Sequence, residues 1–174
     1  TGGRLADLFG RKRAFMVGAS VFAFFSLLSG LMPTVVLLII CRALMGVGGA
    51  VMWPAVLGLT YAILPSSKKA LAGGLILGVA GLGNAVGPLL GGWLTDAATW
   101  RLVFFINVPI TAFAMLVTWR EVPESATPTA ERGIDYRGIA LLSAGTVAVL
   151  LGLDLGTDGG FGRPTVLGLL VLGL

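Results

Sequence analysis

The amino-acid sequence predicts an all-α, polytopic membrane protein, on the basis of its composition, its apolar segments and the placement of its charges. Of its 174 residues, 56% are hydrophobic and 11% are charged, and the mean hydropathy is +0.97. Soluble domains carry about 25% charged residues. A chain with less than half of that charge covers a water-facing surface poorly. We therefore favour a bundle of transmembrane helices over a very apolar soluble core.

Six apolar segments predict the helices, and all but the last are complete spans. A helix of about 19 residues rises about 28 Å, which matches the hydrocarbon core of a bilayer. Helices are expected because an open chain in lipid must satisfy its backbone groups within each segment. The spans, followed by the partial segment, are 14–32, 35–64, 70–94, 102–119, 138–155 and 165–174.

The connectors between these spans alternate in charge. Nine cations fall on one side of the predicted bundle, and only Arg101 and Arg163 fall on the other. Because cytoplasmic loops are enriched in Lys and Arg, we expect 1–13, 65–69 and 120–137 to lie in the cytoplasm. The nine cations are Arg4, Arg11, Lys12, Arg13, Lys68, Lys69, Arg120, Arg132 and Arg137.

Composition also excludes several classes of function. The net charge of +4 does not indicate nucleic-acid binding, because the cations occupy short turns instead of a stripe with interleaved aromatic residues. Cys41 is the single cysteine and histidine is absent, so we expect no disulfide and no metal site, carboxylates being the only remaining metal ligands. No nucleophile–base cluster is visible, so we expect no enzyme. From Thr1 in a loop and Leu174 in an apolar run we expect an internal part of a longer chain.

The turn before the first span is the first candidate functional element. Gly3 and Gly10 bracket the carboxylate of Asp7, and no flexible spacer separates the turn from the span. An ordinary solvated ion pair, worth ~0–1 kcal/mol, is the alternative to a functional role. The cations of this turn are Arg4, Arg11, Lys12 and Arg13.

Arg42 is the second candidate, because no other charged residue lies well inside a span. A central arginine costs about 2.5–3.5 kcal/mol on insertion scales, and its apolar neighbours return roughly 4–8 kcal/mol. The span therefore inserts, but the guanidinium needs a cavity or a partner. Gly46 and Ala50 extend a small face along the same side. A structural ion pair or snorkelling is the alternative to a place on a substrate or proton path.

The third candidate is a glycine strip in the span 70–94. Small residues at this spacing allow close helix packing, and Pro88 removes a backbone donor and bends the helix. Asn84 adds a polar group within the membrane. Ordinary small-residue packing is the alternative, but we expect this helix to be closely packed and bent. The strip comprises Gly83, Asn84, Gly87, Pro88, Gly91 and Gly92.

The fourth candidate is the start of the span 102–119. Trp100 and Arg101 precede it, and Asn107 and Pro109 lie within it. We expect Asn107 to form a hydrogen bond to a neighbouring helix, with a substrate contact as the alternative.

These segments together resemble the major facilitator superfamily. Residues 3–13 resemble its signature loop between helices 2 and 3, with Leu8 where a basic residue is common. Residues 38–50 resemble its fourth-helix signature through Arg42 and the glycines that follow, although Met45 replaces a frequent glutamine. Residues 83–92 resemble the antiporter signature of its fifth helix. Two further stretches, 100–109 and 135–138, resemble the start of helix 6 and the entry to the central helices of the fourteen-helix drug:proton antiporter branch.

The resemblance implies a domain organisation and a function. Residues 1–119 would be helices 3–6 of an N-terminal bundle, 120–137 a cytoplasmic linker, and 138–174 helix 7 and the start of helix 8. The implied protein is a monomeric plasma-membrane antiporter that uses the proton gradient, without a cofactor, to expel drugs or other amphipathic small molecules. Its partners would be a small-molecule substrate, protons and the lipid bilayer.

The resemblance also implies roles for the candidate residues. The loop acid Asp7 and its neighbouring cations would latch the cytoplasmic side, Arg42 would serve proton coupling, and the glycines around Pro88 would form a hinge or seal. The acid on which Arg42 acts would lie outside this chain, because no acid lies mid-span. The alternatives are export of an endogenous metabolite or antibiotic, and a membrane sensor of the same fold that transports nothing.

Overall fold

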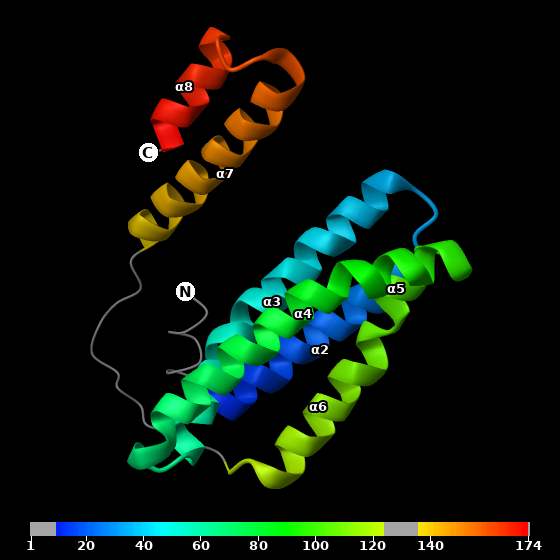
Figure 1. Cartoon of the computed structure of the whole chain (residues 1–174), viewed down its shortest axis with the longest axis vertical. Helices are drawn as coiled ribbons and strands as arrows, with labels where there is room; N and C mark the ends of the chain where they lie inside the picture. The colour runs from blue at the N-terminus through cyan, green and yellow to red at the C-terminus, as the bar shows by residue number, and fades with distance from the viewer. Residues whose placement is uncertain (1–9, 124–135, 174) are drawn as a thin grey trace. The chain divides into compact units, whose positions relative to one another are not determined.

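The computed structural model describes residues 10–123 and 136–173, which form helices joined by short turns (Figure 1). Helices α2 to α6 belong to one compact unit, and α7 and α8 belong to a second. The expected all-α class is confirmed. The elements are α2 (Arg11–Leu31), α3 (Val35–Ile63), the 3₁₀ turn η1 (Ser66–Lys68), α4 (Lys69–Ala97), α5 (Leu102–Phe105), α6 (Asn107–Glu121), α7 (Tyr136–Gly159) and α8 (Pro164–Gly173).

The predicted spans are confirmed in number, and two of them continue at least three residues beyond their predicted ends. The described chain has 5 helices long and apolar enough to cross a membrane, with α8 a shorter apolar helix. The span predicted to end at residue 94 continues to Ala97, and the span predicted to end at 155 continues to Gly159. The predicted ends fall where the sequence becomes less hydrophobic. The helical backbone hydrogen bonds of α4 continue past that point, and the amide of Ala98 still donates to Leu94 O at 3.2 Å. Asp96, predicted in a connector, therefore lies in the last turn of α4.

The fourth predicted span is interrupted. Leu102–Glu121 is apolar enough for one crossing, but α5 ends at Phe105 and α6 begins at Asn107. Pro109 has no N–H to donate to the carbonyl of Phe105, four residues earlier. The neighbouring carbonyl, that of Phe104, accepts a hydrogen bond from Ser26 Oγ at 2.9 Å. The break therefore lies at the point where this crossing is bonded to α2.

Helices α2 and α3 lie side by side and form the centre of the first unit (Figure 1). Their connector is short, and Thr34 caps α3 by accepting a hydrogen bond from the amide of Leu37 at 3.5 Å. The apolar core lies toward the end at which α2 begins, where side chains of α6 also pack against it. Its buried members are Ala14, Phe15, Ala19, Ala55 and Leu59.

The two helices touch backbone to backbone at one pair of glycines. A Cβ atom built on Gly48 would lie 2.7 Å from Gly18 O, and one built on Gly18 would lie 2.8 Å from Gly48 O. Real Cβ atoms do not approach backbone so closely. Glycine at both positions is therefore what permits this crossing.

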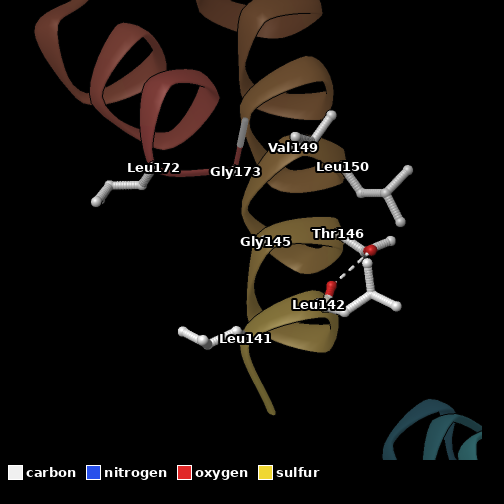
Figure 2. A pocket seen from close by; sticks show the side chains of 8 residues that line it. All are labelled: Leu141, Leu142, Gly145, Thr146, Val149, Leu150, Leu172 and Gly173. Carbon is white, nitrogen blue, oxygen red and sulfur yellow. Dashed lines mark hydrogen bonds between the residues drawn. The ribbon is translucent and has the colours of Figure 1, made fainter. Parts of the chain in front are cut away.

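The second unit is a hairpin of α7 and α8. The helices approach closely where a Cβ on Gly145 would lie 3.3 Å from Gly173 O. Beside this contact is a groove of about 540 Å³, shown in Figure 2. Its single hydroxyl, on Thr146, already donates to Leu142 O at 2.8 Å. The other side chains of the lining are apolar. The lining residues are Leu141, Leu142, Gly145, Thr146, Val149, Leu150, Leu172 and Gly173.

Candidate functional site

The charged turn before α2 is described from Gly10 onward, and Gly3 and Asp7 lie outside the described residues. Gly10 is the N-cap of α2 and has a φ of 93°. L side chains rarely adopt this conformation, so the backbone requires glycine here. The second glycine of the predicted turn thus has a conformational reason for its position.

Two cations of this turn bind backbone carbonyls of other helices. Arg11 Nη1 donates to Gly58 O of α3 at 2.9 Å. Lys12 Nζ donates to Trp119 O at 2.9 Å and to Val122 O at 2.7 Å, at the C-terminal end of α6. Carbonyls at a helix C-terminus carry partial negative charge and have no partner within the helix. Lys12 therefore joins the start of α2 to the end of α6, and Arg13 lies exposed on the same turn.

At the other end of the first unit, Arg42 lines a hollow of about 440 Å³. The hollow brings together three of the sequence candidates that lie far apart in the chain: Arg42, the end of the glycine strip, and Trp100. The lining residues are Arg42, Pro88, Gly91, Gly92, Thr95, Asp96, Trp100, Val103 and Phe104. Arg42, which the sequence predicts to need a cavity or a partner, thus lines this hollow.

The guanidinium of Arg42 lies over an aromatic ring. Its Cζ atom is 4.7 Å from the ring centroid of Phe104. The indole of Trp100 meets the same ring edge-on, with centroids 6.0 Å apart and planes at 87°. A cation within about 6 Å of a ring face is attracted by the ring quadrupole. This contact partly offsets the cost of the charge within an apolar span.

A chain of hydrogen bonds fixes the backbone that carries this ring. Ser26 of α2 is fully buried and its Oγ donates to Phe104 O at 2.9 Å. Asn107 Nδ2 in turn donates to Ser26 Oγ at 3.3 Å. The predicted role of Asn107, a hydrogen bond to a neighbouring helix, is thereby confirmed. Pro109, two residues further along, is exposed.

Arg101 ties the same region to the end of α2. Its Nη1 donates to Gly30 O at 2.8 Å, and its guanidinium lies 5.0 Å from the ring of Trp100. The ring of Phe105 packs so closely on Gly30 that a Cβ there would lie 2.5 Å from it. Arg101 therefore binds a C-terminal carbonyl of α2, as Lys12 does for α6.

The glycine strip is open, contrary to the expectation of close packing. A Cβ on Gly83, Gly87, Gly91 or Gly92 would meet no atom of the described chain within 4 Å. The same holds for Gly46 on α3, and Asn84 is exposed. The helices described here therefore do not pack on the strip.

Three participants in the site were missed from the sequence. Asp96 was assigned to a connector by its polarity, although it lines the hollow from the last turn of α4. Ser26 was hidden in an apolar span, where a lone hydroxyl was the available signal. Phe104 lies in the predicted span 102–119, and no spacing rule connects it to Arg42.

A bundle of membrane-crossing helices with a charged hollow between them is typical of membrane transport proteins. The sequence model described as Major Facilitator Superfamily matches residues 1–173. The chain therefore belongs to the major facilitator superfamily. Its five membrane-length helices make it part of a multi-pass membrane protein of that family, which is a family of transporters and not of enzymes.

Named relatives match nearly the whole chain but are themselves much longer. An uncharacterized MFS-type transporter of Mycobacterium tuberculosis is 37% identical over 97% of this chain and 25% of its own length. The tetracenomycin C resistance and export protein of Streptomyces glaucescens is 36% identical, over 98% of this chain and 32% of its own length. Multidrug resistance protein 3 of Bacillus subtilis is 36% identical, over 88% and 30% respectively. The chain thus spans between a quarter and a third of these relatives.

Proposed function

We propose that this chain forms part of a proton-coupled exporter of drugs or other amphipathic small molecules. The observation that carries the proposal is the position of Arg42, a charge in an apolar span that lines a hollow next to Pro88 and the end of the glycine strip. A fixed cation in such a place acts on the charge state of any acid or substrate that enters the hollow. Export fits the name of the tetracenomycin C resistance and export protein, and drug substrates fit the name of multidrug resistance protein 3.

The proposed mechanism assigns a part to each element. Two bundles would rock about a central site, as in transporters built from repeated halves. The turn that contains Asp7 and Gly10 would latch the cytoplasmic side, and the strip around Gly87 and Pro88 would act as hinge or seal. Arg42, with Gly46 leaving room beside it, would couple substrate movement to protons. The protein would work as a monomer in the cytoplasmic membrane.

The orientation is part of the proposal. The loops at 1–13, 65–69 and 120–137 would lie in the cytoplasm, which places the hollow in the outer half of the bundle. Single cysteines introduced at Lys68 and at Arg163, in a variant without Cys41, should react with a membrane-impermeant maleimide from opposite sides.

The proposed function is tested with purified full-length protein in liposomes. An imposed pH gradient should drive ethidium, a lipophilic cation, across the membrane, and Arg42→Ala should abolish the gradient-driven part. Lys68→Ala, which removes a charge from an exposed turn, is the matched control and should leave transport unchanged. Full gradient-driven transport by Arg42→Ala would contradict the coupling role.

Export of a self-made antibiotic or metabolite is a second candidate, favoured by the relative named for tetracenomycin C resistance and export. A panel that contains aromatic polyketides beside ethidium separates the two, because a dedicated exporter should move only one chemical class. Transport of nothing in the panel would favour a membrane sensor with this fold. The fourteen-helix branch remains our proposal for the family subgroup.

A further inference from the structure

Arg42 lies within an apolar span, is exposed in the described chain and has no charged partner there. In residues 10–123, no hydrogen bond or ion pair joins its guanidinium to a carboxylate or a carbonyl. Asp96 lines the same hollow from the end of α4, and the nearby Arg101 is bound to Gly30 O. Helix α2 has no charged residue in this half of its length. What the guanidinium does meet is the ring of Phe104, at 4.7 Å.

The ring of Phe104 is buried and contacts a second aromatic ring. It is 3% exposed, and the indole of Trp100 abuts it at 87°. Its own carbonyl accepts the hydrogen bond from Ser26, which Asn107 supports. Burial and these contacts restrain the ring, and so restrain the place at which its face meets the cation.

We infer that Phe104 is a positioning residue, whose ring holds the Arg42 guanidinium in the orientation that proton coupling requires. The inference rests on the proposed coupling role of Arg42. A carboxylate partner would occupy the N–H donors of the guanidinium and neutralise its charge. A ring face attracts the cation through its quadrupole and leaves those donors and the net charge available to the hollow. The contact therefore fixes the position of the charge without cancelling it.

The alternative is that Phe104 only fills space, as a buried aromatic residue commonly does. The two roles differ in what they change. Loss of packing lowers every activity of the protein together. Loss of a positioned charge lowers only the step that depends on the proton gradient.

The test compares two rates of ethidium movement in liposomes that contain the full-length protein: efflux driven by a pH gradient, and exchange without a gradient. Phe104→Leu should lower the ratio of driven efflux to exchange about 2- to 30-fold, which is 0.5–2 kcal/mol of cation–π attraction at 1.4 kcal/mol per tenfold. Phe104→Trp should restore the ratio, because indole is the best cation–π partner. Phe105→Leu is the matched control, since its ring packs on Gly30, and it should leave the ratio unchanged.

Two outcomes separate this inference from the proposed function. If Arg42→Ala keeps the ratio of the natural protein, or ethidium is not carried, the proposed function itself fails. If Arg42→Ala lowers the ratio and Phe104→Leu does not, only the inference fails. It also fails if Phe104→Leu lowers the ratio as much in the Arg42→Ala background as alone, because then the ring does not act through the arginine.

A measurement without substrate completes the test. A double-mutant cycle of Arg42→Ala and Phe104→Leu on thermal unfolding should give a non-zero interaction energy. The same cycle with Phe105→Leu should give none. Additive effects for Arg42 and Phe104 would overturn the inference, whatever ethidium does.

Discussion

Helices α2 and α4 are both apolar, both glycine-bearing and both long enough to cross a membrane, yet they differ in how they are held. In the most apolar part of α2, 39% of the residues are buried, against 6% in α4. The glycines of α2 meet other chain segments directly: Gly18 meets the backbone of α3, and Gly30 meets the ring of Phe105. The central glycines of α4 meet open space.

Glycine spacing therefore does not reveal which glycines form close helix contacts within this chain. Glycines every four residues predicted close packing for α4, whereas in the described part of the first unit close backbone contact forms at Gly18 and Gly48, outside any long strip. Helix α2 is also tied at both ends, by Lys12 to α6 and by Arg101 to α5. Helices α2, α3, α5 and α6 are joined by these contacts, and we call them the framework. Helix α4 lies on the framework and has the fewest contacts of the five helices in this unit.

The largest effect is expected where the framework is tightest. Gly48→Ala would place a Cβ 2.7 Å from Gly18 O and from the amide nitrogen of Phe22, and should cost about 1–3 kcal/mol because the backbones must separate. Gly46→Ala is the control on the same helix, where the added methyl meets nothing. It should be neutral or stabilise by up to about 1 kcal/mol. Thermal unfolding of the detergent-solubilised protein measures the stability of both variants. Equal effects would contradict the close contact between α2 and α3 at Gly48.

A smaller effect is expected from the buried hydroxyl that joins α2 to α5. Ser26→Ala removes the donor to Phe104 O and should cost about 0.6–1.7 kcal/mol, the range for interhelical hydrogen bonds in membranes. Ser29→Ala is the matched control, because Ser29 is equally buried but donates to Phe25 O of its own helix at 2.7 Å. If both variants lose the same unfolding free energy, then burial of the hydroxyl matters and its hydrogen bond to α5 does not.

The tie at the start of α2 should have an effect of about 0.5–1 kcal/mol, because Lys12 is half-exposed. Lys12→Met keeps the aliphatic stem but removes both bonds to the end of α6. Hydrogen exchange at the amides of Glu121 and Val122 should then become faster. Lys69→Met removes the same charge from the exposed start of α4 and should leave these amides unchanged.

The smallest effect on stability is expected in the open strip. Gly87→Ala meets no atom of the described chain, so the free energy of unfolding should stay the same or rise by up to about 1 kcal/mol. Ethidium efflux should nevertheless fall if the strip serves as hinge or seal. A loss of stability above about 1 kcal/mol would instead show that the strip packs tightly in the full-length protein.

The sequence by itself determined the number of spans, the all-α class and the family, because apolar length and glycine–proline signatures are local properties of the chain. It also predicted that Arg42 needs a cavity or a partner and that Asn107 bonds to a neighbouring helix, since a polar group in lipid must be accommodated. It could not name these partners. Which atom meets a helix face depends on the rotation and depth of its neighbours, and no local pattern encodes these.

Only the tertiary structure decided that Gly48 lies against the backbone of α2 while Gly46 has no neighbouring atoms, although the two lie two residues apart on α3. It likewise placed Asp96 at the hollow and Phe104 beneath Arg42. The physical reason is the same in each case. Burial in lipid selects helices by their hydrophobicity, while contacts between helices are selected by shape, which emerges only after the helices are packed.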